Sequence, residues 1–239
     1  MTQIRKALGL AVVLAAWAAV MAPAAHAETG ALTAAEFPAI VTGEQAPGVS
    51  FDIGELPAHQ ITCGISRLDG TLIGPSDPTT LIPKYANCIS DPAGTPTTVT
   101  LNGCDYVIGW TRPGTTGWGP NTGGMQAWIN CPVGQRIEIH VYENGVKHAE
   151  NISTCTYDIP PQGPVPAGVY HNTGAGIPDV DPTINARFTG ISTIGAGFLP
   201  CGGDPLTGDI PITVTGKYTL RGYQDFGFVE GAQIPLDVG

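Results

Sequence analysis

The sequence from residue 98 to residue 108 is Thr-Val-Thr-Leu-Asn-Gly-Cys-Asp-Tyr-Val-Ile. Apolar and polar residues alternate on both sides of Asn102-Gly103, as is typical of strands that bury one face. Asn-Gly is the strongest short hairpin signal, because both central residues of the tight turn need a positive φ. We therefore expect a hairpin here, in which Val99 pairs with Tyr106.

The same alternation assigns the two faces of these strands. The core face consists of Val99, Leu101, Cys104, Tyr106, Ile108 and Trp110. The opposite face is polar, with Val107 as the one exception. The segment Met125–Cys131 repeats the pattern, so Cys131 also points inward. This facing suggests a disulfide between Cys104 and Cys131, although six cysteines allow fifteen connectivities.

Strand signals of this kind extend over most of the chain, and no window shows convincing helical periodicity. The 33 glycines and 22 prolines mark many turns between short strands. Many short strands separated by turns are typical of a β-sandwich or a barrel. We predict an all-β, antiparallel β-sandwich. Further strands are expected near residues 39–45, 61–66, 79–89, 137–141, 153–159, 168–172, 184–194 and 210–220.

The proline-rich stretch at residues 160–166 is the only linker-like segment. We predict one mature unit over residues 28–239, with two lobes that divide near residues 159–166 as the alternative. Few strands follow this stretch, which argues against two independent domains.

The first 27 residues are typical of a signal peptide. Arg5 and Lys6 precede an uncharged apolar run of about 15 residues, too short to span a bilayer, and Ala25-His26-Ala27 offers a cleavage site before Glu28. An even number of cysteines in an exported chain indicates disulfides. We predict a secreted protein, extracellular or periplasmic, that does not span the membrane. The cysteines are Cys63, Cys88, Cys104, Cys131, Cys155 and Cys201.

The charge balance excludes some partners. The chain has 10 basic and 20 acidic side chains, for a net charge of −10, and loss of residues 1–27 removes two basic residues and takes this to −12. An acidic surface repels phosphate backbones and anionic lipid headgroups, so nucleic acid is not an expected partner.

Motifs for catalysis or metal binding are incomplete. His140 and His148 flank an Asn-Gly turn in a register that places them on opposite faces, so they do not share an ion. No nucleophile elbow or dinucleotide fingerprint occurs, and we expect no cofactor. Two weaker possibilities remain open. Calcium would use Asp179, Asp181, Asp204 and Asp209, and glycoside hydrolysis would draw on Asp52, Glu55, Asp105 and Glu138.

Two tryptophans form the one suggestive surface feature. Trp128 falls on the polar face of its strand, and Trp118 lies in a glycine-rich loop. Flat aromatic side chains stack on sugar faces and anchor protein interfaces. Alternatively, both pack against a second sheet or lobe. The candidate ligand-binding residues are Arg112, Trp118, Asn121 and Trp128.

Three segments resemble a family of secreted, cysteine-containing, β-rich bacterial proteins with no assigned activity. They are residues 37–45, residues 131–137 and residues 159–162, whose sequences are FPAIVTGEQ, CPVGQRI and IPPQ. The resemblance implies export and β architecture, and it implies no site residues. We therefore expect a non-enzymatic envelope, extracellular structural or adhesion component. The alternatives are a carbohydrate-binding module and a glycoside-type hydrolase.

Overall fold

The computed structural model of the protein describes residues 29–45, 50–53, 60–90, 94–115, 118–142, 155–173, 179–193, 209–225 and 230–239. The signal peptide predicted at residues 1–27 lies outside this part. The described residues form strands and no helix, as the alternation predicts. None of them therefore belongs to a helix long and apolar enough to cross a membrane. The strands are β1 (Thr29–Gly30), β2 (Leu32–Ala34), β3 (Ala39–Gln45), β4 (Ser50–Ile53), β5 (Gln60–Leu72), β6 (Thr79–Ser90), β7 (Thr95–Thr100), β8 (Asp105–Thr111), β9 (Thr122–Asn130), β10 (Ile137–Val141), β11 (Cys155–Ile159), β12 (Gln162–Asn172), β13 (Asp179–Thr193), β14 (Asp209–Asp225), β15 (Glu230–Ile234) and β16 (Leu236–Val238).

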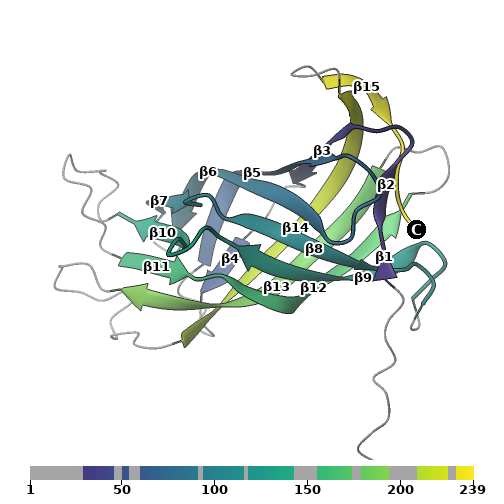
Figure 1. The fold of residues 1–239 in the computed structure, drawn as a ribbon. Coiled ribbons are helices and arrows are strands. Elements are labelled where there is room, and N and C mark those ends of the chain that lie inside the picture. The colour runs from purple at the N-terminus through teal and green to yellow at the C-terminus, as the bar shows by residue number, and fades with distance from the viewer. Residues whose placement is uncertain are drawn as a thin grey trace, which may run out of the picture.

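The sheet closes into an eight-stranded antiparallel barrel (Figure 1). Four positions of the wall are the long strands β5, β6, β13 and β14. The other four positions are each shared by two shorter strands, namely β3 with β4, β7 with β8, β9 with β10, and β11 with β12. Every position pairs antiparallel with the next one along the chain, and β14 closes the ring by pairing with β3 and β4.

The prediction of an all-β antiparallel fold is confirmed, but the prediction of a sandwich is corrected to a closed barrel. Strand alternation is the same in both architectures, because each needs one apolar face per strand. The pairing of β14 with β3 and β4 distinguishes them, and it has no local signal. The proline-rich stretch that was interpreted as a linker leads directly into β12, which pairs with β9 and β13 in the barrel wall.

The Asn102-Gly103 turn forms as predicted, but the strands beside it do not form a hairpin. Both residues have positive φ, 52° and 78°, and the Cys104 N–H donates to the Leu101 carbonyl at 2.9 Å. Both β7 and β8 nevertheless lie antiparallel to β6 and run in the same direction. Val99 therefore pairs with Ile139 of β10 instead of Tyr106. The turn chemistry fixes the turn residues, whereas the neighbouring strands decide the pairing beyond them.

A side chain repairs the corresponding interruption between β11 and β12. The Gln162 amide nitrogen donates to the Thr189 carbonyl at 2.6 Å, and its amide oxygen accepts from the Thr189 N–H at 2.6 Å. Gln162 thus takes the place of a backbone partner for β13, where the wall would otherwise lack ladder hydrogen bonds.

The inner face of the barrel is the core, and the predicted facing of the central strands is confirmed. Side chains at alternate positions of β8, β9 and β14 are at most 5% exposed; they include Tyr106, Ile108, Trp110, Met125, Ala127, Ile129, Ile212, Val214, Tyr218 and Leu220. Val99, Leu101 and Cys131 pack against this core and are partly buried.

Strands from the two ends of the described chain pair and cover one end of the barrel. β2 pairs antiparallel with β16, and Figure 1 shows both at the end opposite to β7, β10 and β11. Leu32, Leu236 and Val238 are at most 3% exposed. Asn172 holds the tail in place, since its amide group donates to the Val238 carbonyl and accepts from the Val238 N–H.

Two disulfides lie in the described part of the chain. Cys104 is bonded to Cys131, which confirms the bridge predicted from facing, and Cys63 is bonded to Cys88 across paired positions of β5 and β6. Such bridges are consistent with an oxidising, extracellular compartment. The side chains of Cys155 and Cys201 lie outside the described part.

We expect replacement of both Cys104 and Cys131 by alanine to lower the free energy of unfolding by about 3–4 kcal/mol. The bridge spans 27 residues, and this is the chain entropy that a loop of that length regains in the unfolded state. Urea denaturation of the folded variant measures it. The Cys63→Ala, Cys88→Ala double variant is a matched control, because its loop spans 25 residues. A loss below about 1 kcal/mol in both would contradict the entropic account.

Candidate functional site

Trp128 lies on the outer face of the barrel, as its place on the polar side of β9 predicts. It pairs with Val107 of β8, while its chain neighbours Ala127 and Ile129 are buried inside. The indole ring extends over Gly109, where an added Cβ would lie 3.0 Å from ring carbons Cζ3 and Cη2. A Cβ at Gly163 would lie 2.8 Å from Trp128 Cδ1. Two glycines thus leave room for the ring against the wall.

An open groove of about 500 Å³ runs beside this ring, and its lining is mostly apolar. Val107, the apolar exception on the polar face of its strand, is part of this lining, which accounts for its place there. The other side chains that line the groove include Pro78, Trp128, Asn130, Pro161 and Gln162.

Trp118 lies over the same outer face, nearer the other end of β9. Its side chain is 42% exposed, and its Nε1 lies 3.7 Å from the position of a Cβ added at Gly124. Gly124 and Trp128 are four residues apart on one strand and so share a face, at a spacing of about 13 Å. We call Trp118, Trp128 and the groove the tryptophan face.

The structure places the other two predicted ligand residues at the Trp118 end of this face. Arg112 directly follows β8, and its carbonyl accepts from the Thr115 hydroxyl at 2.6 Å. Asn121 directly precedes β9, and its carbonyl accepts from the Asn172 N–H at 2.8 Å. Both residues are exposed. Sequence reasoning therefore predicted the outward position of Trp128, and it missed the groove beside that residue.

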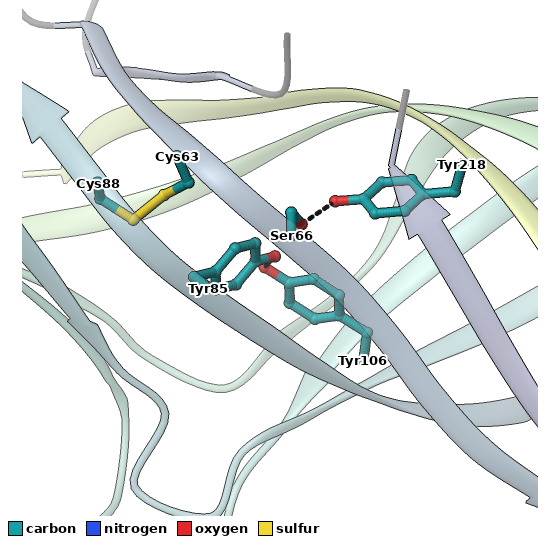
Figure 2. The surroundings of a disulfide bond; sticks show 6 residues. All are labelled: Cys63, Ser66, Tyr85, Cys88, Tyr106 and Tyr218. Atoms are coloured by element: carbon teal, nitrogen blue, oxygen red, sulfur yellow. Dashed lines mark hydrogen bonds between the residues drawn. A yellow bond between two sulfur atoms is a disulfide. The ribbon is translucent and has the colours of Figure 1, made fainter. Parts of the chain in front are cut away.

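A second cluster, which sequence reasoning also missed, lies inside the barrel. Figure 2 shows Ser66, Tyr85, Tyr106 and Tyr218 close to the disulfide between Cys63 and Cys88. The hydroxyl oxygens of Ser66 and Tyr218 are 2.6 Å apart, and the Tyr85 hydroxyl donates to that of Tyr106 at 2.9 Å. We call these four side chains the hydroxyl cluster. The alternation of β6 and β14 indicates that tyrosines point inward, but not that they meet.

Burial keeps these phenols neutral. Desolvation raises the pKa of Tyr218 to about 12, partly offset by hydrogen bonds from Ser66 and Tyr85. Burial also raises the pKa of Tyr85 and Tyr106 well above 10.0. Tyr157 and Tyr170, which lie elsewhere in the core, are shifted in the same direction by the same cause.

Four of the ten side chains considered for metal binding or hydrolysis lie in the described part of the chain, namely Asp105, Glu138, His140 and Asp181. No three His, Cys, Asp or Glu side chains gather there around a common point. Asp181 forms an ion pair with Lys217 at 2.9 Å, and Glu138 lies 3.3 Å from His140 on the outer face of β10. The side chains of Asp52, Glu55, His148, Asp179, Asp204 and Asp209 lie outside the described part.

Comparisons with known proteins identify no relative: no protein-family model matches the chain, and no curated protein and no solved structure matches it.

The five buried phenols should make the protein sensitive to alkali. A pKa raised in the folded state stabilises the fold fully below the unfolded value of 10.0, and this stabilisation is lost as the pH rises from 10.0 towards about 12. Each phenol removes up to about 1.4 kcal/mol per pH unit in that window. Tyrosinate absorbance should therefore appear together with the loss of β-sheet circular dichroism. Ionisation of all seven tyrosines near pH 10 in a chain that stays folded would contradict this burial.

Proposed function

We propose that this protein is an exported, non-enzymatic component of the cell envelope or extracellular matrix, of adhesion type, which binds an uncharged polysaccharide through the tryptophan face. The observation that carries the proposal is the placement of Trp118 and Trp128 on one outer face of β8 and β9. Binding of this kind needs no cofactor.

The geometry of the two indoles supports a polymeric ligand. Each ring offers an apolar surface of the kind that stacks on sugar rings. The two rings lie at successive places along β9, which suits an extended chain better than a single sugar. Asn130 adds a polar group beside Trp128, whereas the Gln162 amide is already bonded to Thr189. Arg112 and Asn121 add polar groups beside Trp118.

The rigidity of the barrel wall supports recognition by this face. Trp128 lies on a ladder of hydrogen bonds that β9 makes with both β8 and β12, and Gly109 and Gly163 fix the space around its ring. A preformed aromatic surface loses little conformational entropy on binding. A binding site on a sheet holds its side chains in more precise positions than a site on loops alone.

The charge of the protein favours a neutral ligand. Acidic side chains outnumber basic ones by 20 to 10, so an acidic polymer would meet net repulsion. Neutral glucans, mannans and galactomannans carry no such penalty.

We expect Trp128→Ala and Trp118→Ala each to weaken binding to the recognised polysaccharide by at least about tenfold, because an aromatic anchor of a binding surface typically contributes more than about 1.4 kcal/mol. The measurement is affinity electrophoresis of the purified protein in gels that contain soluble glucan, mannan or galactomannan. Isothermal titration with the best polymer would follow.

Ile73→Ala is the matched control, because Ile73 is 90% exposed and follows β5, which does not pair with β9. This variant should bind like the wild type. Retardation that is equal in all three variants, or absent for every polymer, would remove polysaccharide binding. A protein partner in the envelope would then be the remaining role for the face.

A further inference from the structure

In the hydroxyl cluster inside the barrel, one hydroxyl hydrogen has no acceptor among the described residues. The Tyr85 hydroxyl donates to that of Tyr106, so this bond does not use the hydrogen of Tyr106. Tyr106 is 5% exposed, and no acceptor for its hydroxyl hydrogen occurs among the described residues.

Gln45 supplies an unused acceptor on the same inner face. It pairs directly with Tyr218, and directly opposite residues of antiparallel strands point to the same side. Its Oε1 atom is buried, and no hydrogen-bond partner for it occurs in the described residues. Buried polar atoms normally have a partner, so this orphan acceptor next to the hydroxyl cluster points to a bound group.

Inward-facing side chains around the cluster leave part of their surface accessible. Tyr85 pairs with buried Ser66, Val99 with buried Ile139 and Val141 with buried Thr97, so all three point inward. Each is nevertheless only partly buried. The opposite end of the interior is filled by the side chains of β2 and β16. The accessible apolar surface of Val99 and Val141 therefore lies at the other end of the interior, on β7 and β10.

The surroundings of the cluster set the chemistry of an occupant. The disulfide of Cys63 and Cys88 lies close to the cluster, and other buried side chains of the interior include Ile61, Ile139 and Val214. The phenols are neutral. They supply no opposite charge, so a charged group would lose its hydration without compensation from the cluster.

We propose that the barrel interior binds a small, uncharged, mostly apolar molecule with one polar group that both accepts and donates a hydrogen bond, such as an alcohol, a secondary amide or an arylamine. The polar group accepts from the Tyr106 hydroxyl and donates to Gln45 Oε1. The apolar part lies against Val99 and Val141. This inner site is separate from the tryptophan face, and it does not depend on polysaccharide binding.

The neutral fluorophore N-phenyl-1-naphthylamine tests this site, because it is apolar and carries one N–H group. Its fluorescence should rise saturably with the full-length mature protein, at one probe per chain. Gln45→Leu removes the acceptor at similar volume and should weaken binding by about tenfold. Val99→Phe fills the space and should abolish binding. Circular dichroism and urea denaturation establish that each variant is folded.

Trp128→Ala separates the two sites, since it alters only the outer groove. It should leave the fluorescence titration unchanged. The inner site is overturned when the wild type shows no saturable rise, when folded Gln45→Leu and Val99→Phe bind like the wild type, or when Trp128→Ala abolishes binding. If Val99→Phe does not fold, Gln45→Leu and the stoichiometry decide the question. The outcome of affinity electrophoresis with polysaccharides does not depend on any of these results.

Discussion

The antiparallel pairing of β14 with β3 and β4 is the constraint on which the rest of the structure depends, because it joins the last position of the barrel wall to the first. Without it both strands would be open edges with unpaired backbone groups. On the outside, Arg221 of β14 and Glu44 of β3 form an ion pair at 3.1 Å, although they are 177 residues apart in the chain. On the inside, the same pairing places Tyr218 beside Gln45. Closure thus creates both the single core and the inner site.

The wall of the barrel combines continuous strands with interrupted ones. β5, β6, β13 and β14 are continuous, whereas each of the other four positions of the wall is divided between two shorter strands. The disulfide of Cys104 and Cys131 joins the connection between β7 and β8 to that between β9 and β10. The Gln162 side chain bonds to β13 where β11 gives way to β12. Tyr85 lies between the part of β6 that pairs with β8 and the part that pairs with β7. The hydroxyl cluster therefore lies at the level where the wall changes from β8 to β7.

The two candidate sites use opposite faces of the same strands. On the outer face, Gly109, Gly124 and Gly163 carry no side chain, and two tryptophan rings lie over them. Trp118 is exposed, and Trp128 is partly buried. On the inner face, tyrosines meet hydroxyl to hydroxyl, and burial keeps them neutral. An extended, neutral polymer suits the first arrangement. A small uncharged molecule suits the second.

The sequence by itself determined the β class, the turn at Asn102-Gly103, the inward facing of Cys104 and Cys131, and the outward position of Trp128. Each follows from a period of two or from the φ preference of particular residues, which are local properties. Only the tertiary structure decided that the sheet is a barrel, that Val99 pairs with Ile139 instead of Tyr106, and that Val107 lines a groove. It alone brought Gln45, Ser66, Tyr85, Tyr106 and Tyr218 together. These outcomes depend on which distant strands pair, and the same alternation is compatible with several pairings until the whole core is packed.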